Sequence, residues 1–325
     1  MTGRHRRIRN LEGRTDFEVD WPLDWHDQEP GMTAVLRVRN EARNLPWVLP
    51  PLFRAVQHVV LVDNLSDDGT PDVARRTAEE VGAADRLTVA SYPFQVSRCG
   101  SEHLSTPEES VHNLAYFYNW SFSHVPTAYS MKWDGDMVLT PEGVATYADL
   151  SWQLEGVEAV VGMPRHPLFV ESDRVAYVDL WMINNEDYVF PMSDRFRYVK
   201  AFEWELRTIP VETRRMRLPE GLCLELKYLD SDEFDHWADQ ETWGATDRTM
   251  RKLREWEVFQ ALREGRVDDL DGVVRLEAPP EWDHVIRYAS EWWLPRRPRP
   301  VAVPPEQQVR RASAQDPSGG TTLRA

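Results

Sequence analysis

The chain of 325 residues contains only two cysteines, Cys99 and Cys223. Two cysteines give no disulfide framework of the kind found in small secreted domains, and they form neither a CxxC pair nor a zinc-ligand spacing. Their scarcity is compatible with a reducing compartment. We interpret both as buried structural residues.

Long apolar runs are also absent from the sequence. No stretch approaches the roughly 18 apolar residues that a membrane-spanning helix needs. The N-terminal segment "MTGRHRRIRN" is basic, but it continues into "LEGRTDFEVD" and not into an apolar segment, so it does not resemble a secretory signal. We therefore expect a cytoplasmic protein with no integral membrane segment.

Positive charge is in deficit, with 38 Lys and Arg residues against 54 Asp and Glu residues and a formal net charge of −16. This charge opposes attraction to phosphate backbones and to anionic lipid surfaces, so we expect no nucleic-acid partner. A small phosphorylated ligand bridged by a cation is compatible with it. The hydrophobic fraction of 42% is sufficient for one large α/β domain or two smaller ones.

The first half of the chain alternates patterns typical of strands and helices, which predicts an α/β fold with a mostly parallel, doubly wound sheet and helices on both faces. Pro50-Pro51 should interrupt or restart the first helix. The expected strands are 33–38, 58–64, 86–91, 128–133 and 158–164, and the expected helices begin near Asn44, Thr70, Pro107 and Pro141.

The second half predicts a smaller antiparallel and helical extension. Residues 165–229 contain short alternating segments rich in aromatics, and charged helices are expected at 247–264 and 283–293. We divide the chain into an N-terminal extension (1–30), a first half (31–165), a second half of the same domain (166–294) and a tail (295–325). The tail is rich in Pro, Arg, Ser and Gly and is expected to be disordered.

Two aspartates in "YSMKWDGDMVL" are the leading candidates for a metal site. The D-x-D pattern occurs three times, but only Asp134 and Asp136 follow an apolar strand and precede a helix. Side chains at i and i+2 of an extended chain point the same way, and Gly135 permits close approach of a ligand. Carboxylates suit Mg²⁺ or Mn²⁺. A polar turn at the end of a strand is the alternative interpretation.

Asp63 ends another apolar run in "HVVLVDNLSDDGT". Ligands bind at the carboxyl ends of strands in open α/β sheets, where this carboxylate could accept a hydrogen bond from a base or a ribose. An Asx-turn or a helix-capping acid is the alternative.

Together, "VLRVRNEARNLPWVL", "HVVLVDNLSDDGT" and "YSMKWDGDMVL" resemble, in order and in separation, the nucleotide-sugar-binding half of family 2 glycosyltransferases with the GT-A fold. The resemblance covers about residues 32–165. It implies a metal-dependent and inverting transfer of a sugar from a nucleoside diphosphate sugar to a hydroxyl of an unknown acceptor. That acceptor is a saccharide, a lipid-linked molecule or a small molecule.

The resemblance also implies roles for individual residues. Asp63 contacts the base, and Asp134 and Asp136 hold Mn²⁺ or Mg²⁺ against the donor diphosphate. Glu225 completes the metal shell, and Lys227 neutralises phosphate. The residues implied to line the nucleotide site are Arg37, Arg39, Asn40 and Glu41.

The resemblance also implies that Asn119 binds the donor phosphate, because it matches an asparagine that follows an arginine in these enzymes. Tyr118 stands at the place of that arginine here, and Arg98 is a candidate substitute.

A carboxylate from the second half should take the proton of the acceptor hydroxyl. We rank Glu203 first and Asp187 second. The other acids considered are Glu186, Glu205 and Asp232.

Three other functions are compatible with parts of the sequence. A phosphatase of the haloacid dehalogenase type would use Asp134 as nucleophile and Asp136 as general acid, but the late acidic loop of such enzymes is missing. A non-catalytic nucleotide-sugar-binding protein would keep the site without turnover. A nucleotidyltransferase would require a glycine-rich loop after the first strand, and "RNEARNLP" contains no glycine.

Overall fold

The computed structural model describes residues 4–201, 204–231, 234 and 247–297, and the chain divides into two units. The first unit comprises Met1–Met163 and Asp187–Leu218, and the second comprises Pro164–Glu186 and Pro219–Ala325. The expected boundary at residue 165 lies two residues from the end of the first segment. Residues 187–218, which we assigned to the second half, group with the first unit.

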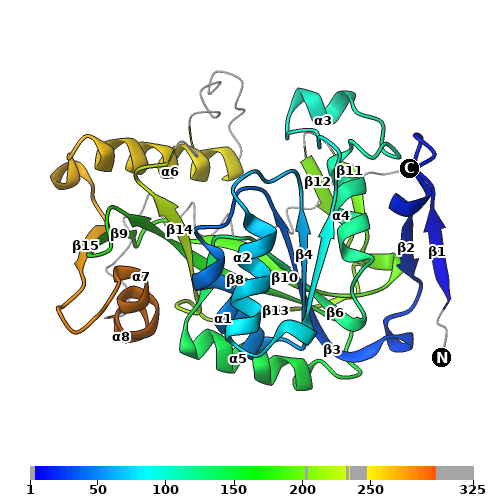
Figure 1. Cartoon of the computed structure of the whole chain (residues 1–325), viewed down its shortest axis with the longest axis horizontal. Helices are drawn as coiled ribbons and strands as arrows, with labels where there is room; N and C mark the ends of the chain where they lie inside the picture. Colours follow the sequence, from blue (N-terminus) through cyan, green and yellow to red (C-terminus); the bar gives the residue numbers. More distant parts are fainter. Residues whose placement is uncertain (1–3, 202–203, 232–233, 235–246, 298–325) are drawn as a thin grey trace. The chain divides into compact units, whose positions relative to one another are not determined.

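A sheet of mostly parallel strands forms the centre of the first unit (Figure 1). Four strands are parallel in the order β5 (Leu87–Ser91), β4 (His58–Asp63), β3 (Glu29–Val38) and β6 (Thr127–Trp133), and β10 (Asn184–Pro191) pairs antiparallel with β6. The inner strands β3 and β4 are almost continuous apolar runs, as expected for strands covered on both faces. The predicted α/β class with a mostly parallel sheet is confirmed.

The strands of this unit are β1 (His5–Ile8), β2 (Val19–Pro22), β3 (Glu29–Val38), β4 (His58–Asp63), β5 (Leu87–Ser91), β6 (Thr127–Trp133), β7 (Met137–Leu139), β11 (Tyr198–Ala201), β12 (Trp204–Arg207) and β13 (Arg214–Arg217). Its helices are α1 (Leu45–Ala55), α2 (Thr70–Glu80), α3 (Ser101–Ser105), α4 (Leu114–Phe122) and α5 (Pro141–Gln153), with 3-10 turns at Thr15–Phe17, Trp25–Asp27, Ala84–Arg86 and Asp194–Phe196. Two strands belong to both units: β8 (Ala159–Val170) and β10 (Asn184–Pro191).

The order of the strands reverses between β3 and β6. From β3 the chain adds β4 and then β5 on one side, and it returns to place β6 on the other side of β3. Because such crossovers are right-handed, the reversal puts α1 and α2 on one face and α4 on the other. In agreement, α1 packs against α2 and α5, whereas α4 packs against β2, β11 and β12 (Figure 1).

Helix α1 continues through Pro50 and Pro51, so the expected interruption does not occur. Each proline lacks the N–H that would bond to a preceding carbonyl, which weakens the helix at this point. The cost is offset by burial, because this helix buries Leu45, Val48, Leu49, Leu52, Phe53 and Ala55. Packing of the apolar face therefore outweighs the local preference of the two prolines.

The second unit contains a small mixed sheet. The later part of β8 pairs in parallel with β14 and antiparallel with β9, and β9 pairs antiparallel with β15. The elements confined to this unit are β9 (Val175–Asp179), β14 (Cys223–Tyr228), β15 (Val273–Glu277), α6 (Asp247–Arg263), a 3-10 turn at Val267–Asp269, α7 (Val285–Arg287), a π-helix at Tyr288–Trp293 and α8 (Leu294–Arg296). The expected tail begins within α8, and residues 298–325 lie outside the described residues.

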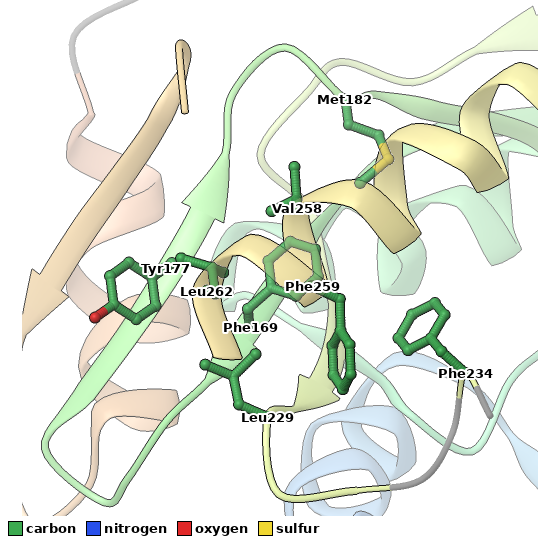
Figure 2. Close-up of a cluster of buried hydrophobic side chains, with 8 residues drawn as sticks. All are labelled: Phe169, Tyr177, Met182, Leu229, Phe234, Val258, Phe259 and Leu262. Carbon is green, nitrogen blue, oxygen red and sulfur yellow. The ribbon is translucent and has the colours of Figure 1, made fainter. Parts of the chain in front are cut away.

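Helix α6 closes an apolar cluster in the second unit (Figure 2). Val258, Phe259 and Leu262 lie on one face of this helix, as their spacing requires. The remaining members are Phe169, Tyr177, Met182, Leu229 and Phe234. The cluster therefore joins α6 to the strands of its own unit.

The two cysteines differ in their surroundings. Cys223 is buried, as expected, but Cys99 is exposed, so our interpretation of Cys99 as a buried residue is wrong. Among the described residues, no helix has the length and apolar character required to cross a membrane.

Truncation of Phe259 should strongly destabilise the second unit. Its ring is fully buried and its centroid lies 4.4 Å from that of Phe234. We expect Phe259→Ala to lower the free energy of unfolding by about 3–5 kcal/mol, measured by urea denaturation. Trp152→Ala is the control, because this side chain is 76% exposed and should cost less than about 0.5 kcal/mol. Equal losses in the two variants would contradict the described core.

Candidate functional site

The carboxyl ends of β3, β4 and β6 meet at one edge of the sheet in the first unit. Val38 is paired with Asp63, and Leu36 is paired with Trp133, the residue before Asp134. Asp63 and Asp134 therefore flank β3 from opposite sides at the point where the strand order reverses. Open α/β sheets have their ligand-binding crevice at this position.

Hydrogen bonds join the loop after β3 to the loop after β4. Asn40 has a left-handed backbone with φ of 60°, its N–H donates to Ser66 Oγ, and its Oδ1 accepts from the Asp67 N–H, both at 2.9 Å. The Glu41 N–H donates to Thr70 Oγ1 at 2.8 Å. Asn40 and Glu41 thus fix the shape of this edge of the sheet. Arg39, which precedes Asn40, is exposed.

Gly135 is in close contact with the loop after β3. A Cβ atom at this position would lie 2.7 Å from Glu41 Cγ and 3.1 Å from Val38 Cγ1. Only glycine fits without displacing the Glu41 side chain, whose Oε2 accepts a hydrogen bond from Asn44 Nδ2 at 2.6 Å. The Asp134-Gly135-Asp136 loop is therefore held against the Asn40-Glu41 loop.

Arg37 brings a positive charge to this edge. Its side chain is only 5% exposed, and its Nη2 lies 3.5 Å from Asp134 Oδ1. The guanidinium carbon lies 3.8 Å from the centroid of the Tyr118 ring and 5.4 Å from that of Phe122, a cation–π arrangement. Within the described residues, Arg37 Nη1 is buried and has no hydrogen-bond partner.

Several groups around Arg37 stabilise its charged form. Burial alone would lower the pKa of the guanidinium, but the surrounding groups raise it above its ordinary value. These groups are Tyr118, Tyr198, Asp134 and Glu205. Tyr118 is also influenced by Lys132, and burial raises the pKa of its hydroxyl. Residues from β3, α4, β6 and the β11–β12 hairpin thus form one polar cluster beside Asp134.

Asp63 is nearly enclosed at the end of β4. The residue is 8% exposed, and in the described part of the chain its buried Oδ1 has no hydrogen-bond partner. A buried acceptor without a partner is costly, so it is a candidate to meet a donor group of a ligand.

The two aspartates after β6 suit a hard divalent cation. The Asp134 side chain is 32% exposed, and Asp136 is partly exposed. Over the described ranges, no group of three or more His, Cys, Asp or Glu side chains is placed to hold a metal ion. Mg²⁺ commonly takes one or two carboxylates and completes its shell with water and phosphate oxygens. The two aspartates therefore fit such an ion when a ligand supplies further oxygens.

Glu225 belongs to an ion-pair network in the second unit. It accepts from Arg165 Nε at 2.5 Å and lies 3.2 Å from Lys227 Nζ. Burial would raise the pKa of this carboxyl, but Arg165 and Lys227 outweigh burial and lower it to about 2. With both cations bound to it, Glu225 has a structural role. We do not carry its assignment as a metal ligand, or that of Lys227 to phosphate, any further.

Asn119 also has a structural role. Its Nδ2 donates to the Tyr198 carbonyl at 2.8 Å and its Oδ1 accepts from the Tyr198 N–H at 2.9 Å, which ties α4 to β11. Both polar atoms of its amide are thus engaged within the protein, and its assignment to the donor phosphate stays a prediction that we do not use below. Arg98 has a side chain that is 76% exposed and pairs with Glu102, four residues along the chain, at 3.1 Å.

The acids considered as proton acceptors differ in their partners. Glu203, ranked first, and Asp232 lie outside the described residues. Asp187 accepts from Arg217 Nη1 at 2.7 Å and from Arg215 Nη1 at 3.0 Å, so both of its oxygens are engaged and we set this assignment aside. Glu205 differs, because its buried Oε2 has no hydrogen-bond partner anywhere in the described ranges.

Comparisons with known proteins give distant likenesses only. No family profile and no curated protein matches this chain. Among solved structures, a mycobacterial protein is 14% identical with a TM-score of 0.31, covering 44% of this chain and 42% of its own. Glucosyl-3-phosphoglycerate synthase from Mycobacterium tuberculosis is 16% identical with a TM-score of 0.30, covering 43% of this chain and 46% of its own.

The same enzyme, in a complex with Mn²⁺, UDP-glucose and phosphoglyceric acid, is 15% identical with a TM-score of 0.30, and the match covers 50% of each chain. The matches therefore span half or less of the length of these proteins. Such low scores carry no argument about this chain, and the function proposed below rests on the residues of the site.

Removing the Glu225 carboxylate should change the pH dependence of stability. Its pKa is about 2 in the folded chain against 4.5 ordinarily, so its contribution is fully present above about pH 4.5 and is lost as pH falls toward 2. That contribution amounts to roughly 3 kcal/mol. We expect Glu225→Gln to be less stable at neutral pH and to lose stability less steeply on acidification, measured by urea denaturation.

Glu277→Gln is the matched control for this experiment. Its side chain is 67% exposed and pairs with Arg275 on the surface. It should keep the slope of the unaltered protein. If Glu225→Gln keeps that slope as well, the ion-pair network does not hold the carboxylate as described.

Proposed function

We propose that this chain is a metal-dependent glycosyltransferase that moves a sugar from a nucleoside diphosphate sugar to an acceptor hydroxyl. One observation carries the proposal: Asp63 and the Asp134-Gly135-Asp136 loop flank β3 at the reversal of strand order. Ligand crevices of open α/β sheets form there. Asp134 and Asp136 suit a divalent cation that binds the diphosphate, and Asp63 offers a hydrogen-bond acceptor to the nucleoside. Together these features fit a donor site of the GT-A type.

The nucleoside would bind beside β4. Asp63 has a buried oxygen that lacks a partner among the described residues, and this oxygen would accept a hydrogen bond from the base or the ribose. One strand separates β4 from β6, which corresponds to about 10 Å between the two aspartate positions. This separation suits the two ends of a nucleoside diphosphate, with Arg39, Asn40 and Glu41 along its length.

The diphosphate would bind beside β6. Asp134 and Asp136 would hold Mg²⁺ or Mn²⁺, and the packing of Gly135 on Glu41 supports this by keeping the loop close to β3. When bound, such an ion supplies Lewis-acid stabilisation of the departing diphosphate. The chain itself fixes the direction of the two carboxylates and contributes the charge of Arg37 beside them.

Glu205 is the acid best suited to take the proton of the acceptor. Its buried Oε2 is not satisfied within the described residues, and it belongs to the same polar cluster as Arg37 and Tyr118. In the inverting reaction, the acceptor oxygen forms a bond to the anomeric carbon while the bond to the diphosphate oxygen breaks. The hydroxyl proton passes to Glu205, and the nucleoside diphosphate leaves.

Substitution of Asp136 should abolish turnover without unfolding the chain. With a panel of nucleoside diphosphate sugars and Mn²⁺, we expect one donor to give nucleoside diphosphate, and Asp136→Asn to lower that rate by about a hundredfold or more.

Glu205→Gln should lower kcat more than it raises KM, because it removes the proton acceptor and leaves the donor contacts in place. Release of nucleoside diphosphate by a coupled assay measures both effects.

Asp72→Asn is the matched control, since this aspartate is exposed on α2. Turnover unchanged by Asp136→Asn would defeat the metal assignment. Tight donor binding without turnover would identify a non-catalytic binding protein, and release of phosphate from simple phosphoesters would favour a phosphatase.

A further inference from the structure

Arg37 is a buried cation that the described protein satisfies incompletely. Its only carboxylate contact there is with Asp134, at 3.5 Å, the outer limit of a hydrogen bond. Its Nη1 is buried without a hydrogen-bond partner among the described residues, and the side chain as a whole is only 5% exposed. Burying a guanidinium in this state is unfavourable, so its presence calls for a compensating role.

A second buried arginine in the same unit shows how a structural arginine is held. Arg207 donates from Nε to the Phe196 carbonyl at 2.7 Å and from Nη2 to Ser130 Oγ at 2.9 Å. Both acceptors are buried. Arg207 Nη1, like Arg37 Nη1, is buried without a hydrogen-bond partner among the described residues, so the two arginines differ in the bonds of their other nitrogens. Arg37, in contrast, has one long hydrogen bond, to Asp134, whose side chain is 32% exposed at the edge of the sheet.

The surroundings of Arg37 make its charge effective at that edge. The rings of Tyr118 and Phe122 cover the guanidinium and exclude water from it. A charge that is poorly screened by water acts more strongly on neighbouring charges than an exposed one. The neighbour in question is Asp134, which is also one of the two carboxylates assigned to the divalent cation.

We infer that Arg37 is a resident cation of the diphosphate subsite, which binds the donor diphosphate together with the divalent ion and shares Asp134 with that ion. This inference rests on the proposed function, because it concerns the same donor. It has two consequences of opposite sign. Arg37 strengthens the binding of a diphosphate when no metal is present, and it weakens the binding of a metal when no diphosphate is present.

Calorimetric titration with UDP, GDP, ADP, CDP and TDP tests the first consequence. For the nucleoside diphosphate that binds best with Mn²⁺, we expect measurable binding to persist in EDTA. Arg37→Met should weaken the EDTA binding by about tenfold or more, and Arg37→Lys, which keeps the charge, should weaken it less. Inorganic pyrophosphate should respond like the nucleotide, and the free nucleoside should not respond.

Electron paramagnetic resonance of Mn²⁺ without nucleotide tests the second consequence. Removal of a positive charge 3.5 Å from Asp134 should tighten Mn²⁺ binding by Arg37→Met several-fold. Damage to the fold would instead weaken both Mn²⁺ and nucleotide, so the opposite signs separate a local charge effect from unfolding. Arg54→Met, at an exposed position in the last turn of α1, is the matched control and should change neither affinity.

The outcomes separate this inference from the proposed function. Binding of a nucleoside diphosphate that requires Mn²⁺ absolutely and does not change in Arg37→Met would overturn the resident cation and leave the transferase proposal intact. Weaker Mn²⁺ binding in a folded Arg37→Met would also overturn it. Failure of every nucleoside diphosphate to bind, with or without Mn²⁺, would overturn both.

Discussion

The reversal of strand order between β3 and β6 is the constraint on which the site depends. Because the chain leaves β3 toward β4 and returns on the other side to form β6, the loops after both neighbours of β3 lie at one carboxyl edge, which is where open α/β sheets bind their ligands. The strand register fixes which residues lie there: Asp63 is paired with Val38, and Asp134 follows Trp133, which is paired with Leu36. Gly135 then brings the acidic loop against Glu41. The position of the acids is thus a consequence of topology.

The electrostatics of this edge balance two tendencies. The chain is strongly acidic, and the edge carries several carboxylates, which by themselves would repel a diphosphate. Arg37, covered by the ring of Tyr118, provides fixed positive charge within this acidic surrounding. A divalent ion would provide the rest. In this account the site accepts a polyanion because Arg37 and an acquired divalent ion act on it together.

The sequence predicted what depends on local pattern and on strand direction. Apolar runs ending in Asp63 and before Asp134 identified two buried strands and their acidic ends, because parallel strands share one carboxyl edge. Roles that depend on distant partners could not be read in this way. Asn119 is bound to Tyr198, 79 residues away, and Asp187 to Arg215 and Arg217. Tyr118 stands where the resemblance expects an arginine. Only the folded chain shows that its ring lies against the guanidinium of Arg37.

The central claim is that a metal ion and a diphosphate meet at the Asp134-Gly135-Asp136 loop. The most direct measurement is an anomalous difference map, recorded at the manganese absorption edge, from crystals grown with Mn²⁺ and the best-binding nucleoside diphosphate. The account predicts one strong peak within coordination distance of Asp134 and Asp136, with diphosphate oxygens completing the shell and the nucleoside beside Asp63. A peak elsewhere, or a nucleotide bound away from the carboxyl edge of β3, would contradict it.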